Sequence, residues 1–222
     1  MFGIILGLGA ALTYGAADFL AGLASRRACV LSVVVWSQFV GLVALLLLLA
    51  VLPPTSPTRT DFLWGAAAGV AGAVGISLLY RALAVGRMSV VSPITAVVAA
   101  IIPVIFGVLR GERPSVVAYG GIALALLAVF LISSSAEQGQ DGRPLHPDRR
   151  PFLSEPGLVE ASVSGVAIGA FYIVISRAGH TAGLWPLVSY RIVSTTLVAA
   201  AALLTRRSLR PSRPSLQPII FT

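Results

Sequence analysis

The chain has 222 residues, of which 57% are hydrophobic and only 11% are charged. A soluble domain is about 45–50% apolar and about 25% charged. Apolar segments of about 20 residues recur along the sequence, and a helix of this length crosses a ~30 Å hydrocarbon core. The composition therefore excludes a soluble enzyme with one membrane anchor, a disulfide scaffold and a disordered chain. It predicts an all-α, polytopic helix bundle in the cell membrane.

The charge is strongly positive: the sixteen basic residues are all arginines, there are eight acidic residues, and the net charge is +8. Most of the arginines lie in short segments between apolar runs, where membrane topology explains them. No nucleic-acid-binding motif accompanies them, so a nucleic-acid partner is not expected. Cys29 is the single cysteine, and His146 and His180 are isolated, so the sequence offers neither an intrachain disulfide nor a zinc motif. No metal and no cofactor are expected.

The apolar runs predict seven membrane spans. In chain order they are Phe2–Leu23, Leu31–Leu52, Phe62–Ala84, Ser89–Leu109, Val116–Ile132, Leu158–Ser176 and Leu184–Leu204. Turn residues separate them, such as Pro53 and Pro54 after the second span and Gly86 after the third. Residues 133–157 are polar and rich in glycine and proline, which predicts a flexible linker between two units.

The sequence contains a weak internal repeat. Sliding the chain by 154 residues lays the sixth span on the first and the seventh on the second, so that Gly15 falls on Gly169 and Trp36 on Tyr190. Few identities support this register, and apolar segments also align by chance. Because the first copy has an odd number of spans, the second copy enters the membrane from the opposite side. Inverted repeats of this kind are a recurring plan of secondary transporters.

The same register leaves the second copy incomplete, because residue 222 lies at the level of Ala68 in the third span of the first copy. We therefore expect the chain to stop about three helices short of a full second unit. The predicted organisation is a five-helix unit over residues 1–132, a linker over 133–157 and the start of a second unit over 158–222, with two helices and a basic tail.

Short motifs accompany the third to fifth spans. They read Tyr80-Arg81-Ala82-Leu83, Ser92-Pro93, Pro103-Val104, Gly111-Glu112-Arg113 and Gly120-Gly121. This stretch resembles the EamA-type half of the drug/metabolite transporter superfamily. The most specific part is the Gly-Glu-Arg turn, which lies between two spans and follows an intramembrane proline.

The resemblance implies two inverted helical units around a central cavity, and the export or exchange of small organic solutes without ATP. The expected partners are a small-molecule solute and the lipid bilayer, with coupling to a proton or a counter-solute. Two alternatives stay open: a non-functional or partner-dependent fragment of such a transporter, and an intramembrane enzyme. The enzyme is disfavoured because the sequence contains neither His-Glu-x-x-His nor Gly-x-Ser-x-Gly.

Three ionisable residues lie inside predicted spans, where each costs about 2.5–3.5 kcal/mol on insertion scales and calls for a partner. Asp18 and Arg81 lie about 24 and 28 Å along parallel helices and are predicted to meet near one mouth of the bundle. The alternative is that each reaches the headgroups independently. Arg191 lies only about 10 Å into its span, which predicts that it points into the bundle. There it would stack on Tyr172, bind backbone carbonyls or bind an anionic solute.

Further polar and aromatic residues at these depths are candidates to contact a solute. They are Tyr14, Trp36, Ser77, Tyr80, Tyr172 and Tyr190. Aromatic residues near the ends of spans also serve as interface anchors or packing groups. Glu112 marks the family turn, and we expect it to pair locally with Arg110 or Arg113.

Pairs of small residues spaced four apart predict close helix packing in lipid. They occur at Gly3/Gly7, Gly65/Gly69, Gly107/Gly111 and Gly165/Gly169. The orientation of the chain in the membrane stays open. Positively charged loops tend to be cytoplasmic, which places the N-terminus outside, whereas the resemblance implies a cytoplasmic N-terminus.

Overall fold

The computed structural model describes residues 2–53, 55–135 and 156–205. These ranges form helices α1 (Phe2–Arg27), α2 (Val30–Val51), α3 (Arg59–Val85), α4 (Met88–Leu109), α5 (Val116–Ser135), α6 (Leu158–Ile175) and α7 (Trp185–Leu204), and a short 3-10 helix, η2 (His180–Ala182), precedes α7. The seven predicted helices are confirmed, and each bound differs from its prediction by at most four residues. Residues 136–155 of the predicted linker and the predicted basic tail from residue 206 lie outside the described residues.

Most of these helices have the dimensions of membrane spans. Among the described residues, the six helices α1–α4, α6 and α7 are long and apolar enough to cross a membrane, and α5 contributes a shorter apolar stretch, Val116–Ala128. Lipid offers no hydrogen-bonding partner to the backbone, so a spanning segment must pair its own N–H and C=O groups, as a helix does. The chain is therefore a multi-pass membrane protein built as a helix bundle.

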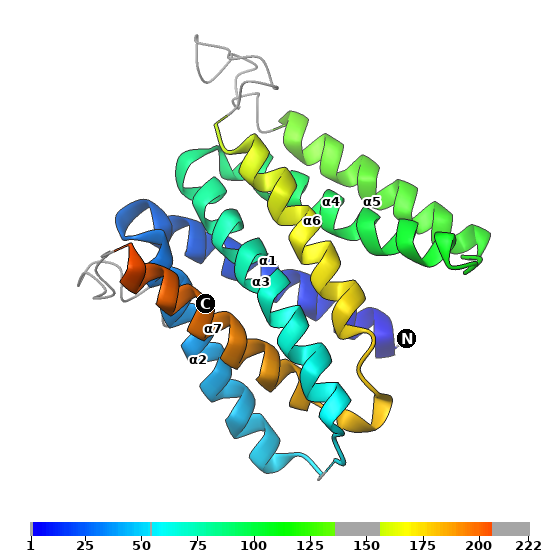
Figure 1. The fold of residues 1–222 in the computed structure, drawn as a ribbon. Coiled ribbons are helices and arrows are strands. Elements are labelled where there is room, and N and C mark those ends of the chain that lie inside the picture. Colours follow the sequence, from blue (N-terminus) through cyan, green and yellow to red (C-terminus); the bar gives the residue numbers. More distant parts are fainter. Residues whose placement is uncertain (1, 54, 136–155, 206–222) are drawn as a thin grey trace.

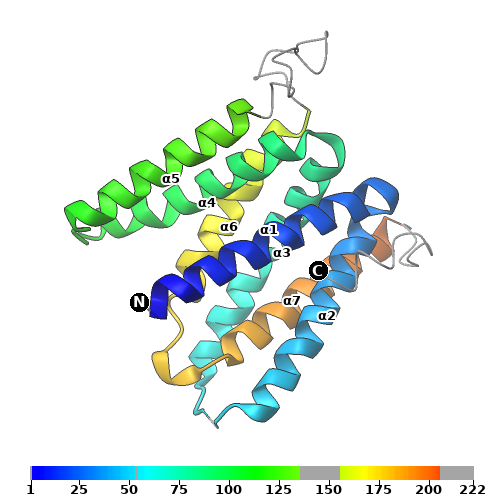
Figure 2. The ribbon, with the colours of Figure 1, turned by 180° about the vertical axis from the view of Figure 1, so that it is seen from behind.

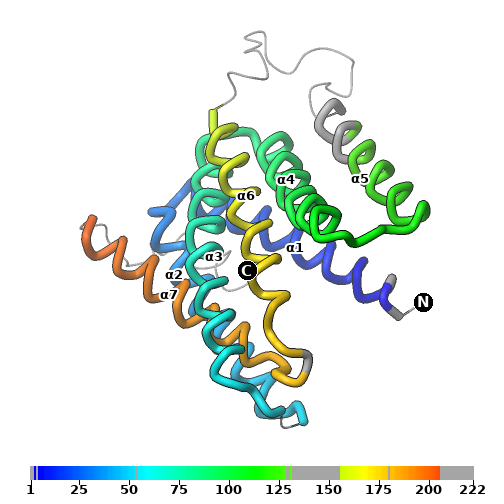
Figure 3. The backbone as a smooth tube through the Cα atoms, turned by 45° about the vertical axis from the view of Figure 1, so that its right-hand side comes forward, coloured from blue at the N-terminus to red at the C-terminus, as the bar shows by residue number. Residues whose placement is uncertain are grey.

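Helix α3 lies in the middle of the bundle. It packs against α6 and α7, and α4 packs against the other side of α6 (Figure 1). Seen from behind, α1 crosses α3, and α2 runs beside α7 (Figure 2). Helix α5 lies at the edge of the bundle against α4 (Figure 3). The central position of α3 means that its small residues decide how closely its neighbours approach.

Two of the predicted small-residue pairs make these close contacts. A Cβ at Gly65 would overlap the carbonyl group of Pro186 on α7, and a Cβ at Gly69 would lie 2.7 Å from the Cβ of Val193. On α6, a Cβ at Gly165 would lie 2.6 Å from the Cβ of Val98 on α4. Such separations are too short for carbon atoms that are not bonded to each other, so the helix backbones pack as closely as they do because these positions are glycine.

The other two pairs do not pack in this way. Nothing in the described structure lies within 4 Å of a Cβ placed at Gly3 or Gly7, and at Gly107 the neighbour is the Glu112 carboxylate and not another helix. The prediction of helix contact is therefore wrong for Gly107/Gly111 and is not met at Gly3/Gly7. Small residues spaced four apart show that one face of a helix can approach another helix closely. They do not show whether another helix lies against that face.

Hydroxyl groups add hydrogen bonds between the central helices. Ser164 on α6 donates to the carbonyl of Gly75 on α3 at 2.7 Å, and Thr95 on α4 donates to the carbonyl of Ala161 on α6 at 3.1 Å. A side chain of α4 therefore bonds the backbone of α6, and a side chain of α6 bonds the backbone of α3. In lipid such bonds stabilise helix association by about 0.6–2 kcal/mol each.

Contacts at the helix ends give the direction of each helix. Arg26 at the end of α1 donates to the carbonyls of Leu83 and Gly86 at the end of α3, at 3.2 and 2.7 Å. Gly86 also lies beside the Pro156 carbonyl, just before α6 begins. Helix α6 therefore starts on the side of the bundle where α1 and α3 end, and it runs in the opposite direction to them.

At the other side of the bundle, Asp61 joins the first turn of α3 to the turn after α6. Its Oδ1 accepts a hydrogen bond from the Gly179 N–H at 2.6 Å, and its Oδ2 accepts bonds from the N–H and hydroxyl of Thr58 at 2.8 and 2.7 Å. The residue is only 4% exposed. Removing the carboxylate would leave several donors without an acceptor in a buried place.

We expect Asp61→Ala to lower the free energy of unfolding by about 1–2 kcal/mol, the usual range for a lost helix cap. The measurement is thermal unfolding of the purified protein in detergent. Arg59→Ala is the matched control, because Arg59 is exposed in the same first turn of α3. Equal midpoints for the two variants would show that the Asp61 bonds contribute nothing to stability.

Candidate functional site

A buried glutamine lies at the centre of the polar residues in the bundle. Gln38 on α2 is 2% exposed, and its Nε2 donates to the Ser194 hydroxyl and, at 3.3 Å, to the Tyr190 hydroxyl, both on α7. Its Oε1 accepts a hydrogen bond from Nη1 of Arg191. The single amide thus contacts three side chains of α7, and all of its bonds cross from one helix to the other.

Arg191 points from α7 toward α2, as its depth in the span predicted. Besides Gln38, its guanidinium lies over the backbone of Gly41 and 5.4 Å from the centre of the Tyr190 ring. The predicted stacking partner was Tyr172, and the structure places the Tyr190 ring there instead. The reason is that the Tyr190 ring fills the space above Gly72 of α3, which brings it beside Arg191.

Besides the contacts of Gln38, one pair of polar side chains joins α1 to α4, and another pair joins α2 to α3. Asp18, half-buried on α1, accepts a hydrogen bond from the Ser92 hydroxyl at 3.5 Å. The hydroxyls of Ser37 and Tyr80 share a hydrogen bond at 3.4 Å. Tyr80 is 4% exposed, so it belongs to the interior of the bundle and not to the headgroup region.

Tyr80 lies near residues of all three groups. It lies close enough to Asp18, Tyr190 and Arg191 to interact with each of them. An acidic group on α1 and a basic group on α7 therefore lie near the same tyrosine of α3. We call Asp18, Gln38, Tyr80, Tyr190 and Arg191 the interior polar cluster.

Aromatic side chains flank the interior polar cluster on the side of α6. Phe171 packs against Tyr190 with ring centres 4.8 Å apart and against Tyr172 at 5.3 Å. Tyr172 in turn lies near Tyr14, Asp18 and Tyr190. The structure thus brings six of the nine predicted site residues into one connected neighbourhood.

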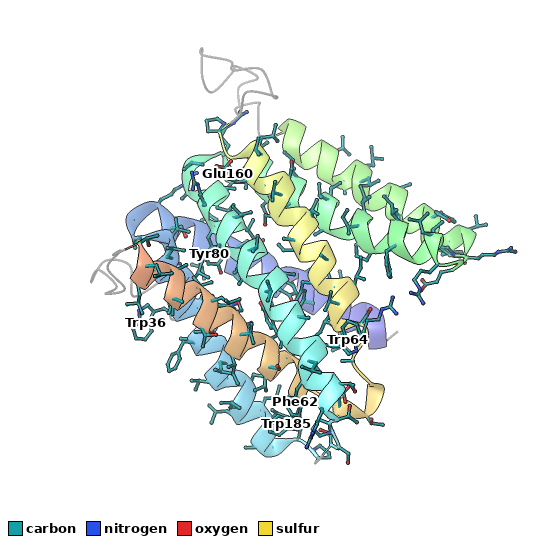
Figure 4. The ribbon with its side chains drawn as sticks, in the orientation of Figure 1. Trp36, Phe62, Trp64, Tyr80, Glu160 and Trp185 are labelled. Atoms are coloured by element: carbon teal, nitrogen blue, oxygen red, sulfur yellow. The ribbon has the colours of Figure 1, made fainter. Side chains whose placement is uncertain are left out.

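The other three predicted residues lie elsewhere. Arg81 forms an ion pair with Glu160 on α6, with Nε and Oε1 3.5 Å apart, so the predicted pairing of Arg81 with Asp18 is not the one found. Trp36 is exposed on the outer face of α2, where it packs edge-on against Phe39 (Figure 4). Ser77 is half-buried on α3, one turn before Tyr80 and Arg81.

The expected local pairing of Glu112 is also not found. Its carboxylate lies over Gly107, and its backbone N–H donates to the Gly107 carbonyl at 3.0 Å. The guanidinium of Arg110 lies 5.8 Å from the centre of the Phe106 ring, and that of Arg177, in the turn after α6, lies 5.4 Å from the same ring. In the Gly-Glu-Arg turn, Glu112 therefore contacts the end of α4 and does not pair with Arg110 or Arg113.

Sequence reasoning missed Gln38 and Glu160. A search limited to ionisable groups passes over Gln38, although a buried amide in an otherwise apolar span also needs hydrogen-bond partners. Glu160 lies in the first turn of its helix, where an acid is favoured by the helix dipole and calls for no other explanation. The useful signal for Gln38 was its place among apolar residues in the middle of a span.

Since the side chain of Arg81 is 65% exposed, its pair with Glu160 is expected to contribute little. We expect Arg81→Gln to change the free energy of unfolding by about 0–1 kcal/mol, the range of exposed ion pairs. Glu160→Gln should have the same effect, and the double variant should match either one. Unfolding midpoints of the four proteins measure this, and a shift as large as that of Asp61→Ala would contradict it.

Three comparisons with known proteins bear on identity. The sequence model of the EamA-like transporter family matches residues 1–134, which contain α1–α4 and all but the last residue of α5. No curated protein matches the sequence. A solved structure, described as the crystal structure of a protein, has a TM-score of 0.57 at 15% identity and covers 95% of this chain and 72% of the other. That likeness supports the fold alone, whereas the family match covers more than half of the chain. The chain therefore belongs to the EamA-like transporter family.

Proposed function

We propose that this protein is a secondary transporter that moves small organic solutes across the membrane by alternating access, as an exporter or an exchanger. The observation that carries the proposal is the interior polar cluster. It brings an acid, a base, an amide and two phenols from four helices, α1, α2, α3 and α7, into the interior of an apolar bundle. Polar groups in such a place are costly and mark solute or ion pathways in membrane proteins.

The proposed architecture is an inverted repeat, with a first unit over residues 1–132, a linker over 133–157 and a second unit from 158 onward. The opposite directions of α1 and α6 support it, since a repeat that follows an odd number of spans must be inverted. The position of the cluster supports it too. It joins α2 to α7, the helices that the repeat makes equivalent, and solute sites of such transporters lie at the interface of the repeats.

We further propose coupling to a proton or a counter-solute, with Asp18 as the candidate group. Asp18 is the acid of the cluster, and its described partner is a neutral hydroxyl, Ser92. A carboxyl group with a neutral partner can gain or lose a proton without breaking an ion pair. This is the property that proton relays in transporters require.

The test is flux in proteoliposomes that contain the purified chain and a mixture of small metabolites, followed by mass spectrometry with and without a pH gradient. We expect at least one organic solute to leave faster than from protein-free vesicles, and the rate to respond to the gradient if a proton is coupled. Folded, reconstituted protein that moves no solute faster than protein-free vesicles would contradict the transporter proposal.

A further inference from the structure

The charge of Arg191 is met by neutral groups. Its described contacts are the amide oxygen of Gln38, the backbone of Gly41 and the ring of Tyr190. Among the described residues, the ion pair that the structure shows joins Arg81 to Glu160, and no carboxylate pairs with Arg191. A guanidinium cannot lose its proton in a protein, so this charge persists at every state of the protein.

Burial of a charge is stabilised by an opposite charge or by enough hydrogen bonds. A guanidinium has five N–H donors in a fixed fork. The structure shows one of these groups, Nη1, donating to Gln38. The half-buried Arg191 therefore keeps donors that a planar, bidentate anion could accept.

Gly41 leaves the space that the guanidinium occupies. A Cβ built on Gly41 would lie 2.9, 3.0 and 3.1 Å from the central carbon, Nη1 and Nη2 of Arg191. Three nearly equal distances mean that the guanidinium plane lies flat over this glycine. An alanine would push the group away, and the long arginine side chain could give way without moving a helix.

Gln38 fixes the guanidinium from its edge. Because arginine has no acceptor, the amide must turn its oxygen toward Arg191 and its nitrogen toward Ser194 and Tyr190. The amide is thus held by three partners and cannot rotate without losing bonds. The result is a positioned positive group whose neighbour cancels none of its charge.

Resting on the proposed function, we infer that Arg191, held between Gly41 and Gln38, binds the carboxylate of the solute, so that the transported class is small organic monocarboxylates, with or without an ammonium group. The fork of a guanidinium matches a carboxylate in two parallel hydrogen bonds. A single carboxylate is favoured over a phosphate because the cluster offers one positive group, Arg191, and one acid, Asp18. A dianion would meet too little positive charge there.

The first experiment is ligand-induced thermal stabilisation of the purified full chain in detergent. Cys29 is the single cysteine, so a thiol-reactive dye reports unfolding at one position. The probes are acetate, butyrate, benzoate and phenylacetate, each beside its neutral amide, together with phenyl phosphate. We expect at least one carboxylate to raise the unfolding midpoint in a saturable way, and its amide and phenyl phosphate to leave the midpoint unchanged.

The second experiment repeats the titration on variants that change the charge or the position of Arg191. Gln38→Glu supplies an internal carboxylate in place of the amide oxygen, and the hydroxyls of Ser194 and Tyr190 can rotate to donate to it. Its own unfolding midpoint should stay the same or rise, while carboxylate affinity falls at least about tenfold. Gly41→Ala should also weaken binding, because it displaces the guanidinium.

Gly120→Ala is the matched control, since no atom of the described residues lies within 4 Å of a Cβ at that glycine, and it should bind as the parent protein does. The inference is overturned if no carboxylate of the panel stabilises the protein, if each amide stabilises as well as its acid, or if Gln38→Glu binds normally. Flux of neutral or cationic solutes without carboxylate binding would overturn this inference and leave the transporter proposal standing. Carboxylate binding without flux of any solute would contradict the transporter proposal and leave carboxylate binding by Arg191 standing.

Discussion

Gly65→Ala is expected to destabilise the bundle by forcing α3 and α7 apart. The added methyl group would overlap the backbone carbonyl of Pro186 and lie 2.9 Å from the side chain of Ser189. A carbonyl at the first turn of a helix cannot rotate away as a side chain can. Relief therefore requires α7 to move away from α3, and overpacking of this kind costs about 1–3 kcal/mol, occasionally more.

The measurement is the unfolding midpoint together with the fraction of monodisperse protein after extraction. Gly120→Ala makes the same chemical change where no neighbour lies within 4 Å, so it reports the effect of the methyl group alone. It should be neutral or slightly stabilising, because alanine is favoured over glycine in a helix by about 0.5–1 kcal/mol. If both variants unfold at the same temperature, α3 and α7 do not pack as the structure shows.

The packing at Gly65 matters for the site because α7 carries Tyr190, Arg191 and Ser194. Gly69, one turn further along α3, meets Val193 and the Tyr190 carbonyl, and Gly72 meets the Tyr190 ring. This row of glycines on α3 sets how closely the side chains of α7 approach those of α2. A shift of α7 should therefore reduce carboxylate binding as well as stability.

Helix positions could be predicted from the sequence because one physical requirement fixes them. A segment must span about 30 Å and pair its backbone internally, so its length and its limits follow from the apolar run. Which faces meet does not follow, because spacing describes one helix at a time. The same pattern of small residues is buried against Pro186 at Gly65 and has no neighbour within 4 Å at Gly3.

The candidate site shows the same division. Depth along a helix correctly placed Arg191 in the interior, because an arginine about 10 Å into a span cannot easily reach water. Depth also placed Asp18 and Arg81 at one end, yet Arg81 turns to Glu160 on α6 and Asp18 to Ser92 on α4. The direction in which a side chain points from the helix axis decides which neighbouring helix it meets. That direction depends on how the helices cross, which depth along one helix does not give.

Arg191→Leu is expected to abolish flux and binding of carboxylate solutes while leaving membrane insertion intact. Leucine fits a span, so insertion should not suffer. Transport should fail because the one positive group of the interior polar cluster is lost. Arg191→Lys should keep partial activity, since lysine keeps the charge but lacks the bidentate fork. Flux in proteoliposomes, normalised to the amount of inserted protein, measures both variants.

The same substitution should also destabilise the protein through Gln38. Once Arg191 is gone, the buried amide oxygen of Gln38 has lost its described donor, and an unpaired buried polar group costs about 1–3 kcal/mol. Gln38→Leu combined with Arg191→Leu removes both partners of this bond and should recover part of that stability, because the hydroxyls of Ser194 and Tyr190 lose their amide partner in the same step. Flux should stay absent in the double variant, which separates the structural role of the pair from its role in solute binding. If the stabilised double variant transports carboxylates at the parental rate, Arg191 only packs α7 against α2, and the solute binds elsewhere in the bundle.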